Sequence, residues 1–236
     1  MNQLSTFECR SYQDAISRLL KRGCLRVNKG SVSMATVRKE IAGKRLVFLG
    51  SHYEAPPKLT LPEIAFVGRS NVGKSSAINR LLNTNRAARV SKTPGRTQAI
   101  NLFEVEERLI FADLPGYGFA KVPDSVKQNW HSLIGGYLAD RSSLKLVVVL
   151  VDIRREPQEL DAEMIWWLRE ERVPLMVLAT KQDKLSRNKA ASSLAKVRKS
   201  FGLSKKMCIG FSSLSGTGVD EMWGLIDEAV TVGFDA

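Results

Sequence analysis

The chain has 236 residues, 44% of them hydrophobic and 25% charged, which is typical of a globular protein with one large domain and an extension rather than two full domains. Its 36 Lys and Arg against 24 Asp and Glu give a net charge of +12, which favours a polyanionic partner, either nucleic acid or an anionic membrane surface. The three cysteines lack metal-ligand spacing and the longest apolar run, 146–151, is far shorter than a membrane span, so we expect a cytoplasmic protein without a transmembrane segment.

Residues 1–43 differ from the rest of the chain. They carry eight Lys and Arg against three Asp and Glu, and they lack the apolar core and the cleavage site of a secretory signal. We expect a basic N-terminal extension that is loosely held and partly disordered. A transit segment for an organelle is one alternative, and a true translation start at Met34 is another. Residues 44–236 are expected to form one α/β domain.

Strand and helix patterns alternate along this domain. The expected strands are 45–49, 63–67, 99–105, 108–113, 145–152, 174–180 and 206–212. The expected helices are 74–83, 124–139, 158–171, 187–201 and 217–231. Residues 146–151 are apolar at every position, as in a strand covered on both faces. The alternation predicts an α/β fold with a mostly parallel sheet of six to seven strands and helices on both faces.

The segment after the second expected strand fits G-x-x-x-x-G-K-[ST], a loop that binds the phosphates of a nucleoside triphosphate. Its residues are Gly68, Arg69, Ser70, Asn71, Val72, Gly73, Lys74 and Ser75. The glycines let the backbone point N–H groups at phosphates, Lys74 would reach the β- and γ-phosphates, and the Ser75 hydroxyl would bind Mg²⁺. The next helix would direct its N-terminal dipole at the same phosphates. The alternative, a glycine-rich turn without a ligand, is disfavoured by the order of strand, loop and helix.

Three further boxes follow expected strands. They are Asp113, Leu114, Pro115 and Gly116; Thr180, Lys181, Gln182 and Asp183; and Phe211, Ser212 and Ser213. Asp113 could hold Mg²⁺ through water, and the Gly116 N–H could meet the γ-phosphate. The Asp183 carboxylate could accept hydrogen bonds from guanine N1 and N2, which adenine does not offer. Open α/β sheets bind ligands at the C-terminal ends of their strands, so these boxes together predict GTP as the nucleotide.

The chain resembles the EngB (YihA/YsxC) family of Ras-like, translation-factor-related bacterial GTPases, from about residue 44 to about residue 230. The stretches that carry the resemblance are GRSNVGKSS at 68–76, SKTPGRTQ at 91–98, DLPGYGF at 113–119, DIR at 152–154, TKQD at 180–183 and FSS at 211–213. The resemblance implies that 44–236 form an EngB-type G domain that hydrolyses GTP, binds the rRNA of the large ribosomal subunit during its assembly, and is needed for normal cell division and septation. Two features depart from the family pattern: the extension at 1–43, and Arg155, where a histidine is common.

The resemblance also implies a switch segment that contacts the nucleotide. Its residues are Gly95, Arg96, Thr97, Gln98 and Ala99. Thr97 would be the switch threonine, with a hydroxyl that binds Mg²⁺ beside that of Ser75. The candidate catalytic residues are then Lys74, Thr97 and Gly116.

Catalysis needs an oriented water, and Tyr117 stands after the DLPG box, where Ras-type enzymes keep a glutamine. The tyrosine either packs as a retracted aromatic side chain or acts as a weak positioning group. Neither His52 nor His131 lies near a nucleotide box. We therefore expect slow intrinsic turnover, with a partner or a cation completing the site. Asn71 is a candidate K⁺ ligand, and the equal alternative is that it only accommodates the loop geometry.

Basic residues gather in two acid-free parts of the chain, 86–97 and 184–219. They are Arg86, Arg89, Lys92 and Arg96 in the first part, and Lys184, Arg187, Lys189, Lys196, Arg198, Lys199, Lys205 and Lys206 in the second. We expect such charges to contact rRNA phosphates, with Lys196, Arg198 and Lys199 as the first to test. The expected protein is a monomeric, GTP-dependent switch on the large ribosomal subunit. Two alternatives are a small-molecule phosphotransferase, which the guanine box disfavours, and a membrane- or septum-associated regulatory GTPase that uses 1–43 on anionic lipid.

Overall fold

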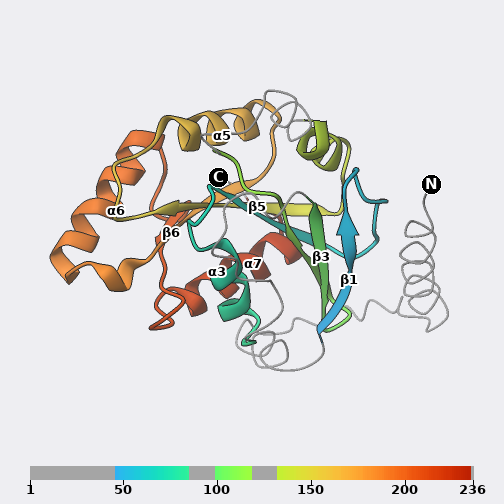
Figure 1. Cartoon of the computed structure of the whole chain (residues 1–236), viewed down its shortest axis with the longest axis horizontal. Helices are drawn as coiled ribbons and strands as arrows, with labels where there is room; N and C mark the ends of the chain where they lie inside the picture. Colours follow the sequence, from blue (N-terminus) through green and yellow to red (C-terminus); the bar gives the residue numbers. More distant parts are fainter. Residues whose placement is uncertain (1–45, 85–98, 119–131, 235–236) are drawn as a thin grey trace, which may run out of the picture.

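The computed structural model describes residues 46–84, 99–118 and 132–234. Within these residues, seven strands form one sheet in the order β1-β3-β4-β2-β5-β6-β7 (Figure 1). The strands are β1 Leu46–His52, β2 Glu63–Gly68, β3 Ile100–Val105, β4 Leu109–Asp113, β5 Leu144–Asp152, β6 Leu175–Thr180 and β7 Cys208–Gly210. The helices are α3 Lys74–Leu81, α5 Glu159–Glu170, α6 Arg187–Phe201 and α7 Val219–Thr231, with a 3₁₀ turn η1 Gln182–Lys184 and a helical segment at 132–138.

The sheet is parallel except at one edge. β2 pairs in parallel with β4 and β5, β5 with β6, and β6 with β7, whereas β3 runs antiparallel to both β1 and β4. β2, β4, β5, β6 and β7 run in the same direction, with crossovers joining them, so their C-terminal ends all lie at one end of the sheet. This arrangement confirms the expected mostly parallel α/β fold, and it gathers the loops after these strands on one rim.

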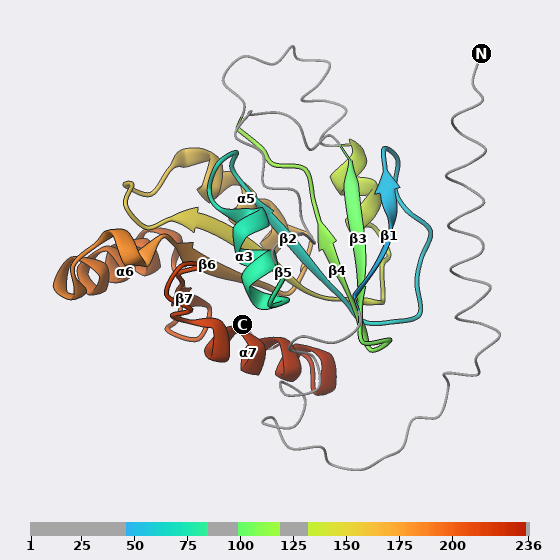
Figure 2. The ribbon, with the colours of Figure 1, turned by 60° about the horizontal axis from the view of Figure 1, so that its bottom comes forward.

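Helices cover both faces of the sheet (Figure 2). α3 and α7 pack on one face, where the Trp223 indole N–H donates to the Leu81 carbonyl at 3.2 Å. α5, α6 and the segment 132–138 cover the other face. Side chains at 146–151 alternate between the two hydrophobic clusters, which confirms the prediction of a strand covered on both faces. Burying an aliphatic side chain stabilises the fold by about 1.5–3 kcal/mol. β5 buries such side chains in both clusters, so it lies at the centre of the core.

Several elements differ in extent from their expected ranges, and β1 ends at His52 rather than at residue 49. β7 has three residues, fewer than the expected 206–212, because the Met207 N–H turns back to the Ser204 hydroxyl before the strand and the Ser212 N–H bonds the Thr217 carbonyl after it. The helix expected at 124–139 is described only from residue 132, and its first part lies outside the described residues.

A buried polar network holds the end of the sheet opposite the C-terminal rim. Glu63, at the start of β2, accepts hydrogen bonds from the Tyr137 hydroxyl at 2.8 Å, the Arg141 guanidinium at 2.9 Å and the Ser143 hydroxyl at 2.6 Å. Arg141 also donates to the carbonyls of Pro56 and Pro57, at 3.1 and 2.9 Å. These bonds tie the connection between β1 and β2 to the segment 132–138. A fully paired network of this kind fixes the arrangement of elements, because removing one partner would leave a buried charge unpaired.

Candidate functional site

The loop after β2 is a tight turn that only particular residues can form. A Cβ on Gly68 would lie 2.9 Å from the Leu150 carbonyl oxygen and 3.0 Å from Val72, so a side chain there would clash. Asn71 and Gly73 are left-handed, with φ of 63° and 106°, a conformation that glycine adopts freely and asparagine tolerates. The φ of Asn71 accounts for an asparagine in the loop by geometry alone.

The loop leads directly into α3. Gly73 is the N-terminal cap of this helix and no side chain caps it, so the first-turn amides of Lys74 and Ser75 have no partner within the helix. No acidic residue lies in this first turn to offset the positive end of the helix dipole. A helix start of this kind binds anions such as phosphate.

Lys74 and Asp113 form an ion pair at the end of β4. The Lys74 ammonium donates to Asp113 Oδ1, and the two residues are only 8% and 3% exposed. The structure thus brings together the lysine that the sequence assigns to phosphates and the carboxylate that it assigns to Mg²⁺. Because the pair is buried, separating the two charges is unfavourable unless each of them gains another partner.

The DLPG box runs beside the phosphate loop. The Tyr117 N–H donates to the Gly68 carbonyl and the Ser70 N–H donates to the Tyr117 carbonyl, both at 3.3 Å. A Cβ on Gly116 would lie 3.0 Å from the Gly68 carbonyl oxygen, closer than most real contacts of a Cβ atom. A glycine at 116 is therefore what allows the two backbones to approach.

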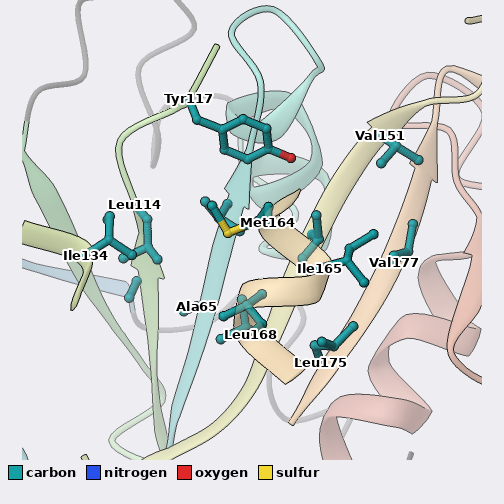
Figure 3. Close-up of a cluster of buried hydrophobic side chains, with 14 of the residues drawn as sticks. Ala65, Leu114, Tyr117, Ile134, Val151, Met164, Ile165, Leu168, Leu175 and Val177 are labelled. Carbon is teal, nitrogen blue, oxygen red and sulfur yellow. The ribbon is translucent and has the colours of Figure 1, made fainter. Parts of the chain in front are cut away.

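The Tyr117 side chain points into the core. The residue is 7% exposed and belongs to the same hydrophobic cluster as Met164 and Ile165 of α5 (Figure 3), and its hydroxyl donates to Asp161 Oδ1 at 2.8 Å. Burial is the main cause that raises the pKa of Tyr117 well above its ordinary value, so the hydroxyl keeps its proton. Of the two roles considered for this tyrosine, the position of the ring fits retracted packing.

Asp161→Asn should make the fold more stable at neutral pH and not at acid pH. Burial raises the pKa of Asp161 above its ordinary value, so the folded state holds the proton more tightly than the unfolded chain does. The contribution of Asp161 to the stability of the parent is therefore fully present below about pH 4 and is lost as the pH rises through the folded pKa. Asparagine is neutral throughout and can still accept the Tyr117 hydrogen bond. Urea unfolding at pH 4 and pH 8 measures this, and a variant less stable than the parent at both pH values would contradict it.

The third box connects β6 to the phosphate loop. The Thr180 hydroxyl donates to the Val72 carbonyl at 2.7 Å, and Lys181 Nζ donates to the Asn71 carbonyl at 2.6 Å. Lys181 also donates to Asp152 Oδ2 at 2.9 Å, at the end of β5. Burial alone would raise the pKa of Asp152, but the bonds from Arg154 and Lys181 outweigh it and hold this pKa well below its ordinary value. Asp152 is thus an ionised anchor for Lys181.

The predicted guanine-binding carboxylate is held by the fourth box. The Ser212 hydroxyl donates to Asp183 Oδ1 at 2.7 Å, and this bond is the main cause that lowers the pKa of Asp183. The Gln182 N–H donates to the Phe211 carbonyl at 3.1 Å, so the two loops are joined by backbone as well. Asp183 is therefore ionised and oriented, and its second oxygen carries an ion pair with Lys184 at 3.4 Å.

The structure describes most of the predicted site, on the rim formed by the ends of β2, β4, β6 and β7. Within the predicted switch segment, Ala99 is buried next to the start of β3, whereas Gly95, Arg96, Thr97 and Gln98 lie outside the described residues. The sequence reasoning gave no role to Asp152 or Asp161. Asp152 could have been found, because it ends the strand between two strands that carry boxes. Asp161 gives no comparable signal, since it lies 44 residues from its partner.

A pocket of about 240 Å³ lies on another side of the phosphate loop. It is lined by residues 69–72 of the loop, residues 151–152 and 154–158 after β5, and Asp161, Lys181, Val197 and Phe201. Lys74, Gly116 and Asp183 do not line it. This pocket shares residues 69–72 and Lys181 with the predicted nucleotide boxes, so it adjoins the predicted site.

Comparisons with known proteins point to one family. The model of a family described as 50S ribosome-binding GTPase matches residues 63–181. The chain is 49% identical over 183 residues to the probable GTP-binding protein EngB of Geobacter metallireducens, covering 78% of this chain and 88% of the relative. It is 51% identical over 168 residues to the probable GTP-binding protein EngB of Vibrio parahaemolyticus, covering 70% of this chain and 76% of the relative.

Solved structures agree with these relatives. A crystal structure of a probable GTP-binding protein EngB has a TM-score of 0.59 and 28% sequence identity, and the match covers 71% of this chain and 98% of that one. Era of Aquifex aeolicus has a TM-score of 0.61 at 22% identity, covering 74% of this chain and 58% of that one, and shares the fold. Of the helices in the described parts of the chain, none has the length and apolar character to cross a membrane.

Proposed function

The chain belongs to the EngB family of GTP-binding proteins, and from this premise we propose that it is a GTP-hydrolysing switch in the assembly of the large ribosomal subunit, needed for normal cell division and septation. Membership makes it a GTP-binding protein of the GTPase class. The observation that carries the guanine assignment is the ionised Asp183, oriented by Ser212 on the rim that also holds the phosphate loop. The ribosomal role is supported by the description of the matching family, 50S ribosome-binding GTPase.

The site residues divide between phosphate, base and metal. Lys74 and the first-turn amides of α3 would hold the β- and γ-phosphates, and the Gly116 N–H would meet the γ-phosphate. Mg²⁺ prefers oxygen ligands, and Ser75 and Asp113 supply a hydroxyl and a carboxylate beside the phosphate loop, so these residues fit the ion. Thr97 is the second proposed protein ligand of Mg²⁺. When bound, Mg²⁺ would neutralise charge on the β- and γ-phosphates.

We propose that intrinsic turnover is slow. In this structure the Tyr117 hydroxyl is committed to Asp161 inside the core, so this side chain does not serve to orient a water molecule. A ribosomal partner or a monovalent cation beside Asn71 would then complete the site. The extension at 1–43 is a separate unit in this proposal, on the contrast in composition given by the sequence.

The surface proposed to bind rRNA is the exposed side of α6. Lys189, Lys196 and Lys199 share this side by helical spacing, opposite the face that buries Val197 and its neighbours. Arg198, which the sequence placed with them, has a different role. Its Nε and Nη2 donate to the Cys208 carbonyl at 2.9 and 2.6 Å, so alanine there would damage the packing of α6 against β7. Lys196 forms an ion pair with Glu156, which leaves Lys189 and Lys199 as the better pair to test.

Lys189→Ala with Lys199→Ala should weaken binding to the large ribosomal subunit and leave nucleotide affinity unchanged. Each lost phosphate contact lowers the slope of log affinity against log salt by about 0.7–0.9, so the double variant should have a slope smaller by about one to two. Sedimentation with purified subunits across a salt series measures this. The control is Lys58→Ala with Lys145→Ala, which removes the same charge from the connection between β1 and β2 and from the start of β5, with Lys58 paired to Asp140 in the parent. Equal losses in the two double variants would argue against a defined surface on α6.

The switch itself is tested by comparing nucleotide states. Binding to the large subunit should be tighter with a non-hydrolysable GTP analogue than with GDP, because only differential affinity lets a nucleotide act as a switch. Equal binding in both states would reduce the protein to a constitutive ribosome binder. Sedimentation of cell lysate tests the alternative function, since a chain found in the membrane pellet rather than with large-subunit precursors would favour a membrane- or septum-associated GTPase.

A further inference from the structure

Ser70 belongs to the phosphate loop, but its hydroxyl has no assigned contact to the nucleotide. Its Oγ is buried, and it has no hydrogen-bond partner among the described residues. An unpaired buried hydroxyl is unfavourable, and native structures hold few such groups without a functional reason. Ser70 therefore needs an explanation other than stability.

The surroundings of Ser70 place its hydroxyl on the side of the loop that faces the DLPG box. A Cβ added to Gly116 would lie 3.6 Å from Ser70 Oγ and 3.5 Å from the Ser70 amide nitrogen. The Ser70 N–H is already used by the Tyr117 carbonyl, so the backbone of this residue is fixed and the side chain alone is available. Gly116 is the residue whose N–H we assign to the γ-phosphate, so the hydroxyl adjoins the proposed γ-phosphate position.

Besides Lys74, which is assigned to the β- and γ-phosphates, other side chains of the described residues near this position are already bonded elsewhere. The Tyr117 hydroxyl points to Asp161 in the core, and Lys181 and Thr180 bond the far side of the loop at Asn71 and Val72. Among the described residues next to Gly116, the Ser70 hydroxyl is thus a donor that remains available for substrate.

We propose that Ser70 is a catalytic residue that donates a hydrogen bond to the γ-phosphoryl group of GTP. In hydrolysis a water oxygen bonds to the γ-phosphorus, the bond to the β–γ bridging oxygen breaks, GDP leaves with that electron pair, and the proton of the water ends on inorganic phosphate. The Ser70 hydroxyl is not consumed. It stabilises charge on the γ-phosphoryl oxygens while the bond breaks, a role for fixed donors that does not require a glutamine. The inference rests on the proposed GTPase site and adds a residue to it.

Ser70→Ala should separate this role from a structural one. A hydrogen bond to a charged group is worth roughly tenfold or more in affinity, so the variant should bind GppNHp about tenfold more weakly than the parent while its affinity for GDP stays within about twofold. Single-turnover hydrolysis at saturating GTP should be slower by about tenfold or more. The urea midpoint should not decrease, because the hydroxyl loses no partner in the fold. Ser70→Thr keeps the hydroxyl and should recover most of the GppNHp affinity and of the rate.

Other outcomes overturn the proposal in distinct ways. Equal losses for GDP and GppNHp, or a lower urea midpoint, would show that Ser70 shapes the loop rather than contacts the γ-phosphate. An unchanged hydrolysis rate would remove it from catalysis. None of these three results contradicts the proposed function, provided that the parent binds GTP. If the parent itself binds neither GDP nor GppNHp, the proposed function fails first, and Ser70 fails with it.

Discussion

Lys74→Ala should weaken the binding of GDP and GTP by the same large factor. The ammonium contact that GDP and GTP share is the one to the β-phosphate, and a hydrogen bond to a charged group is worth about 1.5–3 kcal/mol, so the shared loss should be about 10- to 150-fold. GDP and GTP should lose equally if the shared β-phosphate dominates. Titration with fluorescent GDP and with a fluorescent GTP analogue measures both constants. Affinities within twofold of the parent would remove Lys74 from the phosphate site.

The variant has a second effect that must be separated from the first. Lys74 is the partner of the buried Asp113 carboxylate, and removing one member of a buried pair lowers stability by about 3–5 kcal/mol. Part of the measured loss of affinity would then come from unfolded protein rather than from the missing phosphate contact. The control is Lys74→Ala combined with Asp113→Asn, which removes both charges. This double variant should recover most of the free energy of unfolding while nucleotide affinity stays low.

Asp183→Asn should abolish the preference for guanine and leave the fold intact. The carboxylate accepts hydrogen bonds from guanine N1 and N2, and the amide would set its NH₂ donor against one of them. The loss should be about 2–4 kcal/mol, or roughly 30- to 900-fold in GTP affinity. Competition with GTP and ATP measures this preference. A variant that binds GTP as tightly as the parent does would rule out Asp183 as the base-reading group.

Xanthosine triphosphate provides a positive control for the same variant. Xanthine has a carbonyl at C2 where guanine has an amino group, so the NH₂ of the introduced amide would meet an acceptor while the amide oxygen accepts from N1. The variant should therefore bind xanthosine triphosphate more tightly than GTP, whereas the parent should show the reverse order. This reversal cannot arise from a damaged fold, because damage would weaken both nucleotides together.

The core and the rim could be predicted because their signals are local. A strand that is apolar at 146–151 must be covered on both faces, and a glycine-rich loop between a strand and a helix fixes its own geometry. The boxes at 113–116 and 180–183 each follow a strand, and parallel topology alone brings such ends together. These inferences need only the residue pattern and the direction of the strands.

Long-range pairs could not be predicted in the same way. The pairing of Glu63 with Arg141 spans 78 residues, and nothing in either local pattern marks a buried charge. Arg198 shows a related limit on the surface, since it stands beside Lys199 in the sequence, whereas helical spacing turns it away from Lys189 and Lys196 and its guanidinium bonds the Cys208 carbonyl. The direction of a long side chain depends on neighbours that the sequence brings close only after folding. The partners of buried charges and of individual surface charges are therefore visible only in the folded structure.

The bonds from Thr180 and Lys181 to the phosphate loop have a consequence for how a nucleotide is sensed. They join the base-reading loop at 180–183 to the carbonyls of Val72 and Asn71, so the base-binding and phosphate-binding parts of the site are held together directly. A base that seats poorly would strain the same backbone that positions the triphosphate, and discrimination against a wrong base would extend to the chemical step.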